Sequence, residues 1–315
     1  MSKHRKKHDI NMKRIFFIII GALLLWGCEK TIEFDGEMTK PYIVMISQPE
    51  ADSVWMVDLS YSRFFLLSQE IKTIDDATVT MEVNGSIVSG SAQSLGDGLY
   101  NTHIVPQSGD TLTLRARVGD EEVVAGCRMP FSPTITDFHA EYDTSYNESW
   151  DGSTYAECTP RYHFKLHDKA GEKNYYRIRM FFKYDDCEDC EIENLNFSIE
   201  DPLIYDEDVV VVILNEGENY FYGHSLMFSD ERIDGTTHNI TIDVSLPFAT
   251  QANNTAIIEV SALSRELYLY LSSLEAAENG DDLGFFSEPV QIICNVKGGI
   301  GVLGGMSTTT LKDKL

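Results

Sequence analysis

The side chains best equipped for chemistry lie in one short polar segment, residues 185–191, which reads Asp-Asp-Cys-Glu-Asp-Cys-Glu. Its two thiols can form a disulfide with each other, or Cys187 or Cys190 can pair with Cys158, if the chain folds in an oxidising compartment. A thioredoxin-like redox reaction is the weaker interpretation, because a reactive thiolate needs electropositive surroundings and carboxylates flank both cysteines. The segment therefore predicts a disulfide, with either a local partner or Cys158.

The same segment offers oxygen ligands for calcium, a cation that prefers carboxylates. The four candidate ligands are Asp185, Asp186, Glu188 and Asp189. Neither a glycine turn nor a regular ligand spacing accompanies them, so calcium ranks below the disulfide.

Two further patterns resemble functional motifs, but the residues around each pattern argue against that function. Residues 299–304 match the dinucleotide pattern G-x-G-x-x-G, yet only eleven residues follow, too few for a βαβ unit. His163 and His167 have the spacing of a helical metal pair, but their flanks alternate as in a strand, which separates them by about 13 Å. Neither H-E-x-x-H nor G-x-S-x-G occurs. The sequence predicts no catalytic residue, no enzymatic activity, no cofactor, and no metal site beyond the calcium alternative.

Tyr146 and Trp150 lie in a polar stretch, residues 143–154, in which we expect an irregular loop. Aromatic residues on such loops are candidates for contact with a ligand or partner. The competing interpretation is a loop that packs its own aromatic rings.

Cys28 ends a segment with the pattern of a signal peptide. Basic clusters at residues 3–7 and 13–14 precede an uncharged apolar run, residues 15–27. As a helix the run would be about 20 Å long, too short for the roughly 30 Å hydrocarbon core of a bilayer. Its last residues, Leu24-Leu25-Trp26-Gly27-Cys28, resemble a bacterial lipoprotein processing site, which implies removal of residues 1–27 and a diacylglycerol on Cys28.

The polar residues 28–40 that follow have no periodicity and are expected to form a tether. Translation can start at Met1 or at Met12. Five cysteines follow Cys28, so at most two disulfides can form among them, and we expect the unpaired one to be buried.

Acidic residues dominate the composition. The chain has 50 Asp and Glu against 25 Lys and Arg, a net charge of −25. Such a surface repels a polyanion, which excludes nucleic acid as a partner. The length of 315 residues favours two domains.

Short alternating runs separated by turn signals predict an all-β fold. The expected strands are 42–47, 54–60, 77–83, 99–105, 111–118, 122–129, 135–142, 161–166, 175–184, 209–214, 220–228, 239–246, 257–263 and 289–296. Those in residues 41–131 have the number and spacing of an immunoglobulin-like antiparallel β-sandwich. Pro130-Phe131-Ser132-Pro133 marks the boundary to a second β-rich, sandwich-like domain, residues 132–315.

One segment has helical periodicity. Apolar residues in 265–278 recur at helical spacing, which predicts a short amphipathic helix. Ser264 can cap its start, and Asn279-Gly280 can end it. We expect the apolar stripe to pack on a sheet rather than bind a partner.

Several motifs in chain order resemble one protein family. They are Cys28-Glu29-Lys30, Thr39-Lys40-Pro41-Tyr42-Ile43-Val44, Gly96-Asp97-Gly98-Leu99-Tyr100, Ser108-Gly109-Asp110-Thr111-Leu112, Leu267-Tyr268-Leu269-Tyr270-Leu271, Phe286-Ser287-Glu288-Pro289-Val290 and Asn295-Val296-Lys297-Gly298-Gly299-Ile300-Gly301-Val302-Leu303-Gly304. Together they resemble the Bacteroidota outer-membrane lipoproteins with domain of unknown function 4249, over nearly all of the expected mature chain. The genes of that family tend to neighbour TonB-dependent receptors, which implies an accessory role in nutrient capture.

The expected function is therefore that of a non-catalytic binding or accessory protein, anchored by its lipid to the outer membrane at the cell surface or the periplasmic face. Its expected partner is a TonB-dependent receptor. The alternative is a surface adhesion or glycan-binding protein. A hydrolase built from carboxylates on facing loops is a third hypothesis, because spatial pairing is invisible in a sequence.

Overall fold

The computed structural model describes residues 40–63, 70–88, 90–148, 152–187, 190–204, 220–244, 254–281 and 290–315. The leader and nearly all of the expected tether lie outside the described residues, as does the strand expected at 209–214. Residues 41–315 form one compact unit, and the fold given below is that of this unit.

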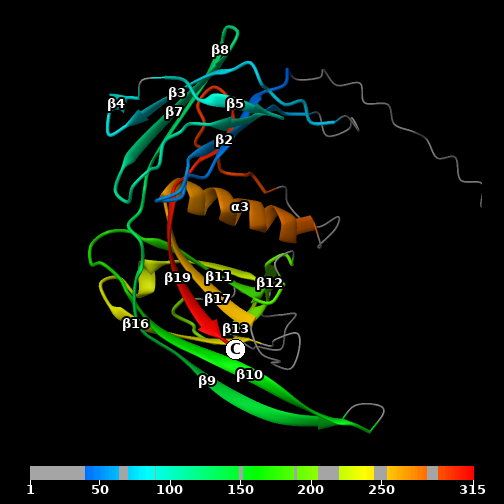
Figure 1. Ribbon diagram of the computed structural model, residues 1–315. Helices are drawn as coiled ribbons and strands as arrows, with labels where there is room; N and C mark the ends of the chain where they lie inside the picture. Colours follow the sequence, from blue (N-terminus) through cyan, green and yellow to red (C-terminus); the bar gives the residue numbers. More distant parts are fainter. Residues whose placement is uncertain are drawn as a thin grey trace, which may run out of the picture. The chain divides into compact units, whose positions relative to one another are not determined.

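Two sheets enclose a first hydrophobic core (Figure 1). Their strands are β1 (Ile43–Ser47), β2 (Met56–Tyr61), β3 (Thr78–Val83), β4 (Ser86–Ile87), β5 (Gln93–Gly96), β6 (Leu99–Asn101), β7 (Thr111–Val118), β8 (Glu121–Arg128) and β18 (Ile300–Leu303). One sheet has the order β18-β1-β2-β6-β5, and the other has the order β4-β3-β7-β8. Side chains from both sheets form one buried cluster, so this part of the chain is a β-sandwich.

Alternation of apolar and polar residues produces this core. In β7 the Leu and Ala side chains are buried, whereas the Thr and Arg side chains between them are more exposed. The largest buried rings also satisfy their polar atoms. Trp55 Nε1 donates to Ser47 Oγ (2.7 Å), and the Tyr100 hydroxyl donates to the carbonyl oxygen of Ile74 (2.9 Å). Neither ring therefore leaves a donor without a partner in the core.

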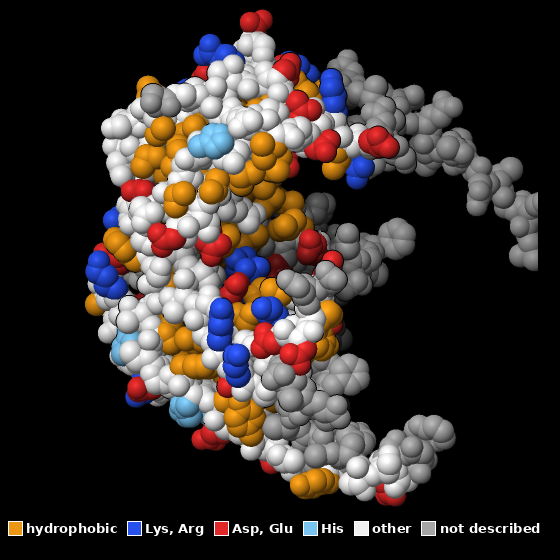
Figure 2. Space-filling view, viewed as in Figure 1, with side chains coloured by type: hydrophobic (Ala, Val, Ile, Leu, Met, Phe, Trp, Pro, Cys, Tyr) orange, Lys and Arg blue, Asp and Glu red, His pale blue; other side chains and the backbone are white. Residues whose placement is uncertain are grey.

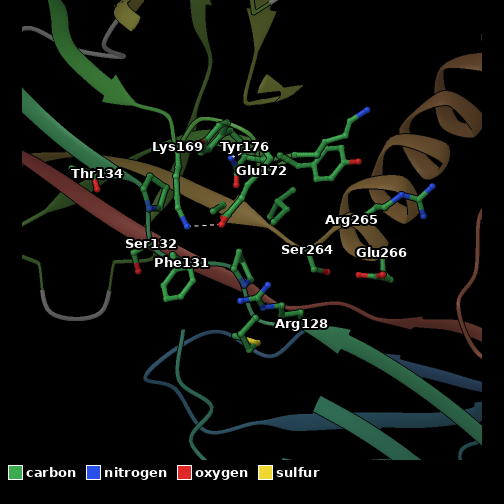
Figure 3. Close-up of a pocket in the computed structure, with 18 of the residues that line it drawn as sticks. Arg128, Phe131, Ser132, Thr134, Lys169, Glu172, Tyr176, Ser264, Arg265 and Glu266 are labelled. Atoms are coloured by element: carbon green, nitrogen blue, oxygen red, sulfur yellow. Dashed lines mark hydrogen bonds and ion pairs between the residues drawn. The ribbon is translucent and has the colours of Figure 1, made fainter. Parts of the chain in front are cut away.

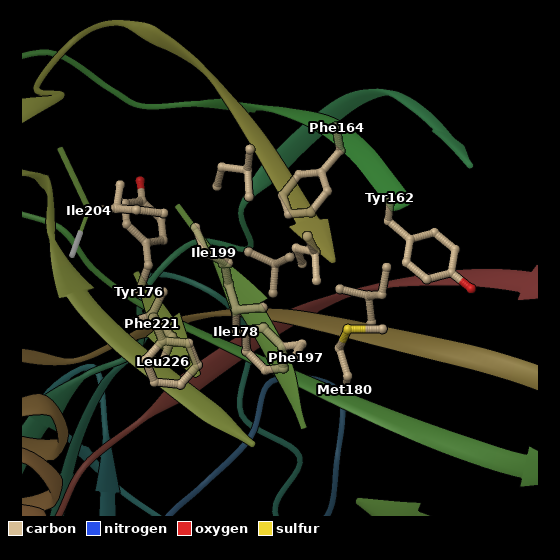
Figure 4. Packing of buried hydrophobic residues seen from close by; sticks show 14 of the residues in the cluster. Tyr162, Phe164, Tyr176, Ile178, Met180, Phe197, Ile199, Ile204, Phe221 and Leu226 are labelled. Atoms are coloured by element: carbon tan, nitrogen blue, oxygen red, sulfur yellow. The ribbon is translucent and has the colours of Figure 1, made fainter. Parts of the chain in front are cut away.

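A second pair of sheets encloses a separate core. The strands are β9 (Thr134–Glu148), β10 (Thr154–His167), β11 (Tyr175–Tyr184), β12 (Glu193–Leu195), β13 (Phe197–Ile199), β14 (Phe221–Gly223), β15 (Ser225–Ser229), β16 (Thr237–Val244), β17 (Asn254–Leu263) and β19 (Met306–Lys314). The orders are β14-β13-β16-β10-β9 and β12-β11-β17-β19, and β15 pairs with β11. Figure 4 shows aromatic and aliphatic side chains from both sheets meeting in this core. The all-β prediction is confirmed.

The C-terminal residues take part in both sandwiches. Strand β18 lies parallel to β1, with Val44 opposite Ile300, and β19 lies antiparallel to β17. The first sandwich thus contains a parallel pair, where the sequence predicted antiparallel strands only. Both cores belong to one compact unit, and the division into domains 41–131 and 132–315 stays a prediction.

Helix α3 (Arg265–Asp281) covers the predicted helical segment. Its start is capped as predicted, because Ser264 Oγ accepts a hydrogen bond from the Leu267 N–H (3.3 Å). Leu267 is fully buried, which agrees with a packing role for the apolar stripe. The predicted end at Asn279-Gly280 is wrong, because the helix continues to Asp281, and a glycine inside a helix costs only about 1 kcal/mol. None of the described helices is both long and apolar enough to cross a membrane.

Two expected features differ from the structure. Residues 143–148 are not an irregular loop but the end of β9, which pairs with β10 as far as Thr154. Residues 290–296 form no strand. Other hydrogen bonds hold the segment instead: Ile293 N–H donates to Ser273 Oγ (2.9 Å), and Asn295 Nδ2 donates to the carbonyl oxygen of Leu303 (2.8 Å). In residues 290–296 apolar and polar residues do not alternate with the period of two that a strand requires, and this is the sequence signal that the segment is not a strand.

We predict that Gly301→Ala lowers the free energy of unfolding by about 3 kcal/mol. Gly301 has a φ of 120°, and a Cβ at this position would collide with the backbone carbonyl oxygen of Met45 in β1. Gly119→Ala is the matched control, since Gly119 also has a positive φ (59°) but open space around it, and its expected cost is about 1 kcal/mol. Urea unfolding of both variants measures the difference. Equal costs would contradict close packing of β18 on β1.

Candidate functional site

A groove lies where the two sandwiches meet, and Figure 3 shows side chains that line it. Three segments contribute: the connection 128–134 after β8, parts of the turn 167–176 between β10 and β11, and residues 262–266 at the start of α3. The groove has a volume of about 660 Å³. This volume is in the range of small-molecule sites.

Basic side chains outnumber acidic ones along the groove. The basic residues are Arg128, Lys169, Lys173 and Arg265, and the acidic residues are Glu172 and Glu266. Lys169 Nζ and Glu172 Oε1 pair with each other at 2.5 Å, as the dashed line in Figure 3 marks. Elsewhere the charges are mixed, and Figure 2 shows acidic and basic side chains interspersed over one face. On a chain with a net charge of −25, a locally basic groove favours an anionic ligand.

A smaller hollow of about 380 Å³ adjoins the groove, because Lys173, Tyr175 and Arg265 line both. The Tyr175 ring stacks on the ring of Tyr268 from α3, with centroids 4.5 Å apart. Lys173 Nζ lies 6.0 Å from the centroid of Tyr175, a cation–π contact. The wall between the two hollows is therefore aromatic and cationic, which suits a ligand with both a flat apolar part and a negative charge.

Hydrogen-bonded carboxylates hold the turn between β10 and β11. Asp168 accepts from the Tyr176 hydroxyl (2.6 Å) and from the Gly235 N–H (2.8 Å), and Asp230 accepts from the Asn174 N–H (2.6 Å). Burial raises the pKa of Asp230, and burial together with the bond to Asp168 raises the pKa of Tyr176. Because these carboxylates already accept bonds from the protein, we interpret them as supports for the groove wall rather than as bases for catalysis.

The predicted cysteine pairing is resolved in favour of the local alternative. Cys187 and Cys190 form a disulfide, with a Cα–Cα distance of 5.3 Å. Cys158 lies on β10 opposite Thr144 of β9. The two cysteines are only three residues apart, and the turn after β11 brings their Cα atoms close enough for the bond.

The calcium prediction stays untested. Asp185 accepts a hydrogen bond from Thr255 Oγ1 (2.6 Å) and lies 3.8 Å from Lys183 Nζ. Asp186 lies in the turn that follows β11. Glu188 and Asp189 lie outside the described residues. In the described part of the segment, Asp185 thus already has partners within the protein.

Of the two aromatic candidates and the lipidation site, only Tyr146 lies within the described residues. Tyr146 lies on β9 and is 76% exposed, so it is available to a ligand although it is not on a loop. Trp150 and Cys28 lie outside the described residues. Their roles in ligand contact and acylation stay predictions.

Sequence reasoning missed the groove because its walls come from three distant segments. The only sequence signal near the groove is Pro130-Phe131-Ser132-Pro133. The sequence predicts a domain boundary there, and in the structure the segment forms one wall of the groove. Prolines stiffen such a connection and fix its position.

Comparison with known proteins gives one family match. A family model described as domain of unknown function (DUF4249) matches residues 29–312. No curated protein matches the sequence. A solved structure from Corynebacterium diphtheriae, described as a membrane anchored protein, has 11% identity and a TM-score of 0.22, and the alignment covers 72% of this chain and 55% of that one. The collagen adhesin from S. aureus has 8% identity and a TM-score of 0.19, with 88% and 95% covered. Likenesses this distant say nothing about ligands.

We predict that the two described free cysteines differ sharply in reactivity. Burial, reinforced by the negative charge of Glu266, raises the pKa of the Cys127 thiol to about 12, whereas Cys294 is exposed. Brief treatment of the native protein with iodoacetamide at pH 8, followed by peptide mass spectrometry, should alkylate Cys294 and leave Cys127 unmodified. Denaturant should expose Cys127 to the reagent. Rapid alkylation of Cys127 in the native protein would contradict its burial in the core of the first sandwich.

Proposed function

Because the chain belongs to the DUF4249 family, we propose that it is a lipid-anchored, non-catalytic binding protein of the outer membrane that assists a TonB-dependent receptor in nutrient uptake. The anchor is the acylated Cys28, and residues 28–40 are the tether. The unit formed by residues 41–315 presents the binding surface.

The position of the family match carries this proposal. The match begins at residue 29, immediately after the cysteine that ends the lipoprotein-like segment. A family match that starts directly behind Cys28 supports cleavage at this cysteine. The matched region is then the mature protein, and the leader lies outside it. A β-rich unit behind a short polar tether is a rigid scaffold that can reach a partner near the bilayer.

The groove is the proposed binding surface. Its basic residues make the groove locally positive on a chain whose net charge is negative, and its aromatic wall adds apolar contact. Such a combination suits an acidic segment of a receptor or an anionic nutrient, and both share carboxylate or phosphate chemistry. Asp168 and Asp230, which hold the turn beside the groove, already accept hydrogen bonds from the protein, and this favours binding over hydrolysis.

We predict that Cys28→Ser releases the protein from membranes. The acyl chains provide the affinity for the bilayer, and the serine variant cannot be acylated. After cell fractionation, the unaltered protein should sediment with outer membranes and the variant should appear in the soluble fraction. Cys294→Ser is the matched control and should stay with the membranes. Membrane retention of Cys28→Ser, or an N-terminal peptide that keeps residues 1–27, would contradict lipidation.

We also predict co-purification of a TonB-dependent receptor with the native protein in mild detergent. The double variant Lys173→Glu, Arg265→Glu reverses the charge of the groove and should reduce receptor recovery at least about 10-fold. Lys312→Glu, an exposed residue outside the groove, is the matched control and should leave recovery unchanged. Recovery of the native protein without a receptor would overturn the accessory role. Glycan-array binding together with that result would support the adhesion alternative.

A further inference from the structure

The outer face of the sheet that contains β9, β10 and β16 brings two histidines and a glutamate together. His139 and His163 lie directly opposite each other in the antiparallel register of β9 and β10. Glu141 follows His139 by two residues and therefore projects from the same face of β9. One ligand atom of each residue lies within 4.8 Å of those of the other two. Side chains of three residues that commonly ligate metals thus converge on one point.

A β-bulge fixes the tautomer of His139. The register of β9 and β10 shifts between His163 and Lys165, and Asp137 on the bulged strand has a φ of 56°. The carbonyl oxygen of Asp137 lies 2.9 Å from His139 Nδ1. Because a carbonyl oxygen can only accept, Nδ1 of the neutral ring carries the proton, and the lone pair lies on Nε2.

His163 is oriented in a similar way from the neighbouring strand. Its Nδ1 lies 3.1 Å from the hydroxyl oxygen of Thr241 on β16. Its Nε2 is buried and has no hydrogen-bond partner, although it lies 3.7 Å from Glu141 Oε2. A buried nitrogen without a hydrogen-bond partner destabilises the fold, and a bound ligand would remove that cost.

We propose that His139, Glu141 and His163 bind a divalent transition-metal ion of the zinc class. Two imidazole nitrogens and one carboxylate oxygen are a ligand set that suits zinc, nickel or copper better than calcium or magnesium. Each ring uses its Nδ1 for a protein contact, which is the usual way in which a ligating imidazole is held. The site shares no residue with the groove and does not depend on the proposed function.

Capture of the ion requires a small movement of exposed side chains. Four ligands around zinc, at about 2.1 Å each, lie roughly 3.4 Å from one another. The rings of His139 and His163 are stacked, with centroids 4.9 Å apart and 20° between their planes. The His139 ring must therefore tilt so that both lone pairs point to one centre. His139 and Glu141 are exposed and have room for this movement, whereas the contact with Thr241 orients the His163 ring.

The charges around the site permit a cation. Arg161 pairs with Asp243 at 2.6 Å, and Lys165 pairs with Asp137 at 2.7 Å. Each neighbouring positive charge is thus balanced by its own carboxylate. Glu141 has a side-chain exposure of 68% and adds a negative charge next to the two imidazoles. A water molecule can supply the fourth ligand of such a site.

Titration of the detergent-solubilised, chelator-treated full chain with ZnCl₂ by calorimetry tests the proposal. We expect one saturable site, and we expect His139→Ala and Glu141→Gln each to weaken zinc affinity at least about 10-fold. Cobalt(II) should give the visible absorption of a tetrahedral site at one equivalent, and this band should be lost in His163→Gln. The absorption reports coordination directly and separates this site from unspecific binding to surface carboxylates.

His167→Ala is the matched control. His167 lies on the same face of β10, but both ring nitrogens have hydroxyl partners, Thr136 at 2.7 Å and Thr237 at 2.9 Å. Its replacement should leave zinc affinity and the cobalt spectrum unchanged. Thermal unfolding without metal checks that each variant is folded, and His139→Gln replaces the alanine variant if that one is not. Absence of the cobalt band, or zinc affinity that persists in folded His139→Ala and His163→Gln, would overturn the proposal.

Discussion

Backbone pairing of the C-terminal residues with two separate sheets is the constraint on which the structure depends. Strand β18 adds to the sheet of β1, and β19 adds to the sheet of β17, with only Gly304 and Gly305 between them. Glycine is required at Gly304, because a Cβ there would collide with the backbone of Leu267 in the helix, and a Cβ on Gly305 would displace the Met129 sulfur. At Gly304 the chain passes between the two packed cores only because it has no side chain there.

The groove follows from this constraint. Ser307 Oγ donates to the carbonyl oxygen of Pro130 (2.6 Å), and Thr309 Oγ1 donates to that of Pro133 (2.7 Å), so β19 holds the connection between the sandwiches. The Ser264 N–H donates to the carbonyl oxygen of Gly305 (2.8 Å), which fixes the start of α3. Two of the three groove walls are thus bonded to the same C-terminal segment, residues 305–309. A basic surface assembled in this way has a fixed geometry before any ligand arrives, which lowers the entropy lost on binding.

The sequence was sufficient for the fold class and for many individual strands, because local alternation and turn residues determine both. Strands β7 and β11 and the cap at Ser264 depend only on neighbours in the chain, and they were predicted correctly. Strand β18 was missed because its short glycine-rich sequence acquires strand structure only by lying against β1. The cluster on β9 and β10 was missed for a related reason. A pattern search along one strand finds His163 and His167, whereas register across two strands places His163 beside His139.

The parallel pairing of β1 with β18 also affects the order in which the chain can fold. Ile43 emerges near the beginning of synthesis, yet the edge of its sheet has no partner until Ile300 has followed it. Contacts between such distant residues form late and slowly, since a long loop must close first. Until then the chain is an intermediate with an open strand edge, the kind of species that self-associates. Shielding of this open edge until β18 is in place is therefore expected to raise the yield of folded protein.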